Sequence, residues 1–163
     1  MTLVELTVSL LILSTMSLAI ALMFRLAITA QRLCSEQTRV LSNVRKALHG
    51  DGPVPGMIFD TLYASSATAA SSSSSLFLVA LGGATTSYAL SASDLQRTAG
   101  GSAANLAAGL SNLSFAYYML DPGGRVVSTT TYSAADLVTF TFRASLPRTS
   151  PAFYSGARLK NRP

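Results

Sequence analysis

The sequence is poor in the residues that build disulfides, metal centres and catalytic sites. It has one cysteine and one histidine among 163 residues, and charged residues make up only 12% of the chain. A single cysteine excludes an internal disulfide, so packing alone must hold the fold, and we expect Cys34 to be a small packing residue or, as the alternative, an intersubunit bridge. No metal-ligand cluster and no nucleophile–base–acid set is recognisable. We therefore expect no cofactor, no metal and no enzymatic activity.

Proline and glycine are absent from the first 49 residues and frequent afterwards. Residues 6–24 also lack any charge, and these 19 residues rise roughly 29 Å as a helix, about the thickness of a bilayer core. The pattern predicts a helix over 1–49, with 1–24 crossing a membrane or forming a filament core. His49, Gly50 and Pro53 predict where it ends.

Residues 25–49 are predicted to continue the helix with an amphipathic pattern. One face repeats every seven positions in Leu26, Leu33 and Val40, and a basic stripe repeats in the same way. The stripe is solvated or contacts acidic surface on other subunits. Its members are Arg25, Arg32, Arg39 and Lys46. Glu36 is spaced to pair with two of these arginines.

Glu5 is the only charged side chain before Arg25. A carboxylate near the middle of a membrane helix costs about 2.5–3.5 kcal/mol on insertion scales. Two interpretations follow: the carboxylate stays wet among lipid headgroups, or a cation compensates it. The α-amino group of a neighbouring copy's residue 1 would serve, because its pKa of about 7.7–8 keeps it mostly protonated. In the second interpretation Glu5 sets the register of one helix against the next.

The first six residues together with the uncharged helix resemble the mature N-terminus of the type IV pilins and type II secretion pseudopilins, in its class III form. They are Met1, Thr2, Leu3, Val4, Glu5 and Leu6. The resemblance implies that a prepilin peptidase removes a basic leader and that Met1 becomes N-methylated. Cationic residues after the span support a removed leader, because the positive-inside rule would otherwise keep the remaining chain in the cytoplasm. Filament-core packing is then expected from Leu3, Val4, Leu6, Leu10 and Leu13.

One position departs from the family pattern. Many major pilins have a proline near position 22, where the helix unwinds on assembly, and this chain has Leu22. Ser14, Thr15 and Ser17 could rebond the backbone locally without forcing a break. Whether residues 14–22 unwind in a filament stays open.

The remaining chain predicts a connector over 50–75 and an antiparallel β domain over 76–163. The connector is rich in proline, glycine and serine, so we expect a mobile loop, with O-glycosylation as the alternative. Strands are expected at 76–81, 85–90, 94–97, 113–119, 125–131, 136–143 and 153–159, and a small flexible segment at 100–108. The predicted class is α+β, a long helix packed on an antiparallel sheet. This half resembles J-type pseudopilins and W-type minor pilins.

The resemblance implies a structural subunit of a type IV pilus-like filament. The expected partners are copies of the chain, other pilins, the prepilin peptidase, the assembly platform and, before assembly, the bacterial inner membrane; the destination is an extracellular filament or a periplasmic pseudopilus. Alternatives are a minor subunit that primes or tips such a filament, an adhesive or DNA-binding pilin, and a single-span membrane-anchored sensor or enzyme. A net charge of +5 without an aromatic-interleaved basic run gives nucleic acid weak support. The candidate polyanion contacts are Arg143, Arg148, Arg158, Lys160 and Arg162.

Overall fold

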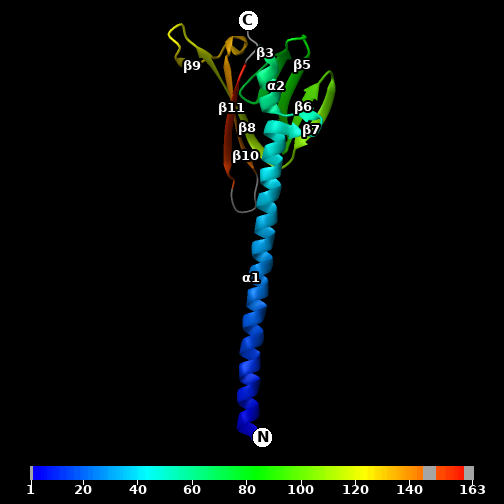
Figure 1. Ribbon diagram of the computed structural model, residues 1–163, viewed down its shortest axis with the longest axis vertical. Coiled ribbons are helices and arrows are strands. Elements are labelled where there is room, and N and C mark those ends of the chain that lie inside the picture. Colours follow the sequence, from blue (N-terminus) through cyan, green and yellow to red (C-terminus); the bar gives the residue numbers. More distant parts are fainter. Residues whose placement is uncertain (1, 145–149, 160–163) are drawn as a thin grey trace. The chain divides into compact units, whose positions relative to one another are not determined.

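The computed structural model describes residues 2–144 and 150–159. The chain divides into two compact units, one ending at Arg39 and the other beginning at Val40. Helix α1, Leu3–His49, runs through the first unit and supplies the opening residues of the second (Figure 1). Strands make up most of the second unit, so the predicted α+β class is confirmed.

Helix α1 ends at His49, immediately before Gly50. Gly50 has φ +97° and Gly52 has φ +59°, values that side chains with a Cβ adopt only rarely. Strands β1, Gly50–Asp51, and β2, Val54–Pro55, then form a small antiparallel hairpin. The predicted end at His49 is confirmed. The helix is continuous over residues 14–22 in this structure.

The second unit contains two larger antiparallel sheets, where a single sheet was expected. One has five strands in the order of the chain, and the other has four in the order β11-β10-β8-β9. The five are β3 Ala64–Ala67, β4 Ser75–Ala80, β5 Thr85–Ser91, β6 Asp94–Ala99 and β7 Ser102–Ala107. The four are β8 Leu110–Leu120, β9 Val126–Ser128, β10 Leu137–Ala144 and β11 Ala152–Arg158. A 3-10 turn, η1 Tyr132–Ala134, precedes β10.

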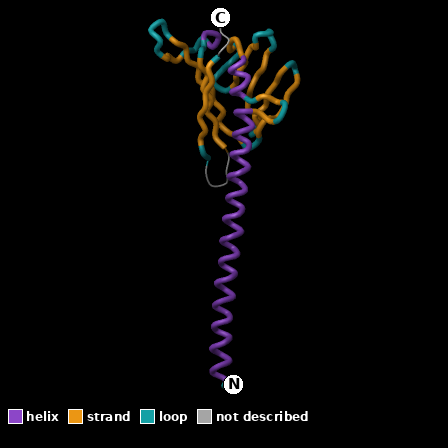
Figure 2. The backbone as a smooth tube through the Cα atoms, in the orientation of Figure 1, coloured by secondary structure: helices purple, strands orange, loops and turns teal. Residues whose placement is uncertain are grey.

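The core lies between the inner faces of the two sheets, close to helix α2, Met57–Tyr63, and the last turns of α1 (Figure 2). Strand β10 follows the expected alternation: Val138, Phe140 and Phe142 are fully buried, and the residues between them face outward. Helix α1 contributes Val40, Val44 and Ala47. Their spacing of four and then three residues places all three on one helix face.

The predicted mobile connector over 50–75 is wrong. It contains α2 and β3, and Met57, Thr61 and Ser71 within it are buried. The serine run is a hydrogen-bonded turn, in which the Ser71 hydroxyl donates to the Phe77 carbonyl and accepts from the Phe77 amide. The prediction rested on the serine, glycine and proline content of this segment. It failed because hydrogen bonds between side chains and backbone order the segment.

Other local expectations also fail. The segment 100–108 contains strand β7, Ser102–Ala107, which pairs with β6. Leu26 is 71% exposed and Leu33 38%, so in this structure the buried face of α1 begins only at Val40. Cys34 is exposed and does not pack as expected. Among the described residues, Glu36 forms no ion pair with its arginine neighbours.

Candidate functional site at the start of the helix

The first turn of α1 is closed by a reciprocal pair of hydrogen bonds. The Thr2 backbone amide donates to Glu5 Oε2 at 2.8 Å, and the Glu5 amide donates to Thr2 Oγ1 at 3.3 Å. This is a capping box, which satisfies two amides that the helix itself leaves without partners. The carboxylate also lies at the positive end of the helix dipole. Glu5 therefore has a role within its own chain that the sequence analysis missed, although the T-x-x-E spacing carried the signal.

The capping box leaves part of the Glu5 carboxylate free. A carboxylate offers about four acceptor sites, and Oε1 receives no hydrogen bond from the residues that the structure describes. The side chain is exposed. Glu5 could therefore keep its own helix capped and accept a second donor from another molecule. Met1, the predicted site of processing and methylation, lies outside the described residues.

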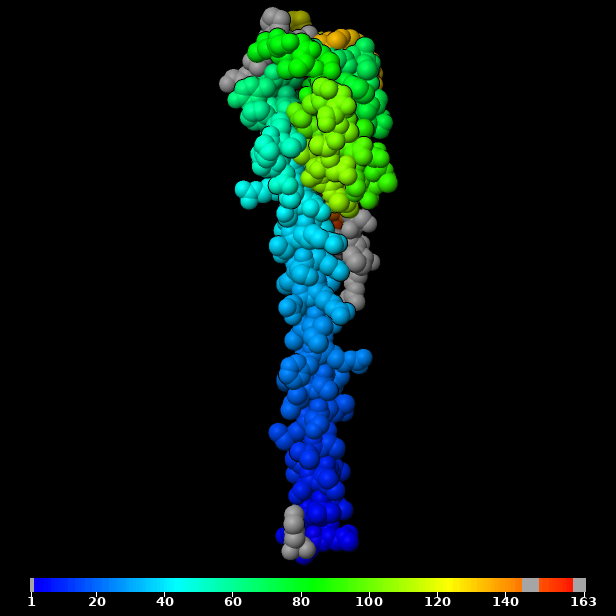
Figure 3. Space-filling view, turned by 90° about the vertical axis from the view of Figure 1, so that its right-hand side faces the viewer, coloured from blue at the N-terminus to red at the C-terminus, as the bar shows by residue number. Residues whose placement is uncertain are grey.

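The apolar residues expected to pack a filament core all lie on the surface. Their exposed fractions are Leu3 81%, Val4 67%, Leu6 50%, Leu10 57% and Leu13 63%. Side chains project from this segment along its length (Figure 3). A helix that is apolar on every side needs lipid or protein around it. By length and composition α1 could cross a membrane, and a membrane anchor or a signal sequence has this character.

Four hydroxyl side chains of this segment are bonded within the helix. Thr7 donates to the Val4 carbonyl at 2.9 Å, and Ser9 donates to the Glu5 carbonyl at 2.8 Å. Ser14 and Thr15 donate in the same way to carbonyls three residues earlier. These bonds reduce the cost of placing hydroxyls in apolar surroundings. The segment is thus prepared for a dry environment in spite of its polar residues.

The described candidates for polyanion contact lie far apart. Arg143 is opposite Ala152, and Arg158 is opposite Leu137, so six positions of β10 separate the two arginines. At about 3.4 Å per residue this is roughly 20 Å. Both are exposed on the outer face of the four-stranded sheet. Arg148, Lys160 and Arg162 lie outside the described residues. The described part of the chain therefore does not gather the predicted set into one patch.

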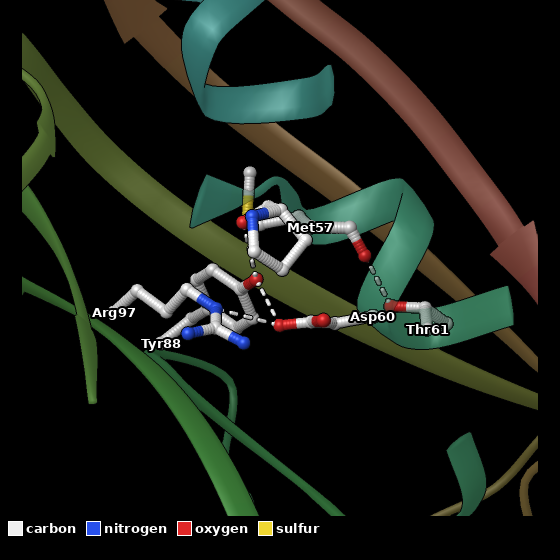
Figure 4. A network of polar contacts seen from close by, with 6 residues as sticks. Met57, Asp60, Thr61, Tyr88 and Arg97 are labelled. Atoms are coloured by element: carbon white, nitrogen blue, oxygen red, sulfur yellow. Dashed lines mark hydrogen bonds and ion pairs between the residues drawn. The ribbon is translucent and has the colours of Figure 1, made fainter. Parts of the chain in front are cut away.

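A part-buried polar network in the second unit was not predicted at all. Asp60 Oδ2 accepts from Tyr88 Oη at 2.6 Å and from Arg97 Nε at 2.8 Å (Figure 4). Burial, and then the Asp60 carboxylate, raise the pKa of Tyr88 well above its usual value. Partial burial would lower the pKa of Arg97, but its contacts with Asp60 and Tyr88 together outweigh burial and raise it. The network fastens α2 to β5 and β6, and we assign it a structural role.

No local pattern in the sequence predicts this network. Asp60 lies in the segment predicted as a connector, and its partners are 28 and 37 residues away. A long-range polar contact of this kind has no periodicity that could reveal it. Among the described residues no group of histidine, cysteine, aspartate and glutamate could hold a metal ion. No family model matches the chain, and no similar protein was found among curated proteins or solved structures.

Proposed function

We propose that this protein is a structural subunit of a type IV pilus-like filament, held in the bacterial inner membrane before assembly. The observation that carries the proposal is the exposed apolar surface of α1 beginning at Leu3, with a single carboxylate, Glu5, at its start. The resemblance of residues 1–6 to pilin N-termini supports the same assignment. In a filament the helices would bury this surface against one another, and the second unit would face outward.

Glu5 would set the register between neighbouring copies. In apolar surroundings an uncompensated carboxylate is expensive, and the α-amino group of a neighbour's residue 1 would offset that expense. The capping box supports this role, because it fixes the carboxylate at the helix start through Oε2, while Oε1 accepts no hydrogen bond from the described residues. A neighbouring helix at the wrong axial offset would leave the carboxylate unpaired. The ion pair would therefore favour one axial offset between neighbouring helices.

Three substitutions separate registration from capping. Glu5→Gln retains an acceptor for the Thr2 amide, since glutamine also serves in a capping box, but it removes the charge. Thr2→Val removes the hydroxyl cap and keeps the Glu5 charge. Glu5→Val removes both functions. If registration is the role of Glu5, we expect all three proteins to insert in the membrane, while Glu5→Gln and Glu5→Val give poor fibre yield and Thr2→Val assembles.

Fibre yield is measured by shearing cells and comparing the fibre fraction with the membrane fraction. Normal fibres from Glu5→Gln would remove the registration argument. Loss of fibres in Thr2→Val but not in Glu5→Gln would assign Glu5 to capping alone.

Intact-protein mass spectrometry of the sheared fraction tests the N-terminus directly. Methylated Met1 in bulk fibres would support an abundant pilin. Methylated protein that is found mainly in membranes would support the alternative, a minor pilin or pseudopilin that primes or tips a filament. A formylated or longer unprocessed start would contradict the pilin proposal.

A further inference from the structure

A groove opens along one edge of β8, where no strand covers it. Strand β9 pairs with β8 only at Tyr118, Met119 and Leu120. Further along the same edge, the Phe115 amide donates to the Ser73 carbonyl at 2.8 Å, and the Tyr117 carbonyl accepts from the Thr129 amide at 2.9 Å. The serine turn and the segment after β9 therefore stand on either side of a gap, which forms a cavity of about 210 Å³.

The walls of the groove are aromatic and rigid. Tyr117 is buried, and its hydroxyl donates to the Ser72 and Ser75 carbonyls at 3.0 and 3.2 Å. The Tyr132 ring lies edge-on to the Tyr117 ring, with 4.6 Å between the ring centroids. Tyr118 is half-buried and also lines the cavity. Because the Tyr117 hydroxyl and ring are both fixed by partners, this wall needs little reordering when a ligand enters.

The rim of the groove is made of hydroxyls. Ser73, Ser128 and Thr130 line it and are exposed. Their hydroxyls make no hydrogen bond to another described residue, so they can donate to a ligand and accept from it. None of the described residues that line the groove is charged. The site therefore offers aromatic surface and neutral hydroxyls, with no counter-charge for an ionic ligand.

These properties restrict the ligand class. A purely apolar ligand would leave the hydroxyls of the rim without partners, which costs free energy. A peptide strand is also disfavoured as the ligand. The edge of β8 that remains open, between the bonds to Ser73 and Thr129, runs only from Phe115 to Tyr117, which is shorter than most strands. A neutral sugar ring has apolar C–H faces for the tyrosines and hydroxyls for the rim. The cavity is smaller than a drug-sized site, which suits one ring.

We propose that this groove binds a neutral saccharide, with one sugar ring against the tyrosine side of the lining and its hydroxyls bonded to Ser73, Ser128 and Thr130. The proposal concerns the second unit and does not depend on filament assembly. It also differs from polyanion binding through Arg143 or Arg158, because no described residue that lines the groove is a cation.

The test uses the full chain in a detergent without a sugar headgroup, since a maltoside would compete. Tyrosine-ring NMR signals are followed during titration with the methyl glycosides of glucose, galactose, mannose and N-acetylglucosamine, and with glucose 6-sulfate. We expect saturable shifts of Tyr118 and Tyr132 with at least one neutral glycoside. The shifts should be insensitive to salt, and the sulfated sugar should bind no more tightly.

Variants test whether the sugar binds in the groove. Tyr118→Leu should lower the affinity roughly 3- to 10-fold, the loss expected for one aromatic contact. The double variant Ser128→Ala/Thr130→Ala should lower it further without affecting the core. Tyr154→Leu and Ser114→Ala are the matched controls, because both residues are exposed outside the groove, and they should bind as the unmodified chain does.

Three results would overturn the proposal. They are the absence of a saturable shift with every neutral glycoside, shifts that Tyr118→Leu leaves unchanged, and tighter, salt-sensitive binding of the sulfated sugar. The unfolding midpoint of each variant is measured alongside, so that a change in affinity is not confused with loss of the fold.

Discussion

The Nε atom of Arg97 lies 2.8 Å from Oδ2 of Asp60, and the two side chains are only 16% and 13% exposed. This ion pair joins helix α2 to the fourth strand of the five-stranded sheet, β6. Tyr88 from β5 binds the same carboxylate oxygen. Three elements therefore depend on one carboxylate. Its removal would leave the Arg97 guanidinium without this acceptor and the Tyr88 phenol with only a 3.5 Å contact to the Pro55 carbonyl.

Asp60→Ala is expected to destabilise the second unit strongly. Breaking a fully buried ion pair from one side costs about 3–5 kcal/mol, and the loss here should lie at or below the lower end of that range because Arg97 and Asp60 are 16% and 13% exposed. Urea unfolding, followed by circular dichroism, measures the loss. Asp94→Asn is the matched control, since Asp94 holds no ion pair among the described residues and should change stability by less than about 0.5 kcal/mol.

Removing both charges together should cost less than removing one. We expect Asp60→Leu/Arg97→Met to be more stable than Asp60→Leu alone, because the double variant leaves no buried charge. Equal stabilities of the double variant and Asp60→Leu would show that an unpaired Arg97 charge costs nothing at this site, which would contradict the prediction.

Alkaline pH is expected to destabilise the second unit through Tyr117. Burial is the main cause that raises the pKa of Tyr117 to about 12 from an ordinary value of 10.0. The unfolded chain therefore loses the proton first, and this stabilising contribution is complete below about pH 10 and lost as the pH rises through about 12. Unfolding midpoints in urea over this range should fall, and Tyr117→Phe should fall less steeply. A parallel decline in both proteins would contradict this assignment.

Gly50→Ala is expected to disturb the junction between α1 and the rest of the second unit. Gly50 has φ +97°, and a Cβ there would lie within 3.0 Å of backbone atoms of Val54, Pro55 and Gly56. We expect a loss of roughly 1–3 kcal/mol from the backbone conformation, with a further cost for the displaced backbone. Gly52→Ala is the control. It shares a positive φ but meets no atom within 4 Å, so its thermal midpoint should fall less.

Ala47→Leu tests how tightly the end of α1 packs on the sheets. Ala47 is completely buried, so the larger side chain should cost about 1–3 kcal/mol by overpacking. Leu41→Ala changes volume on the exposed face of the same helix, where Leu41 is 59% exposed. That variant should unfold within about 0.5 kcal/mol of the unmodified chain. Similar losses in both would contradict the docking of this helix face.

The regular elements were largely readable from the sequence. The absence of proline and glycine before Gly50 predicted α1 and its end, and the alternation of Val138, Phe140 and Phe142 predicted both β10 and its buried face. These features depend on local periodicity, which a sequence displays directly. Glu5 was recognised as a special residue, yet its capping bond with Thr2 was missed.

The rest required knowledge of contacts between distant residues. Serine and proline content concealed α2, because its order comes from Met57 and Thr61 packing in the core and not from composition. The division into two sheets could not be predicted, since it depends on which strands pair, and local sequence patterns do not show pairing between distant strands. The groove along β8 exists only because the serine turn approaches Phe115, more than 40 residues later in the chain.

The two sheets differ in when they can form. Each strand from β3 to β7 pairs with the strand next to it in the chain, so this meander is complete once residue 107 is available. Strand β10 lies between β8 and β11, and that sheet must wait for the last strand of the chain. Local pairing closes short loops and is fast, whereas pairing at longer range is slower. During synthesis from the amino end, the five-stranded sheet could therefore form before all strands of the four-stranded sheet are available.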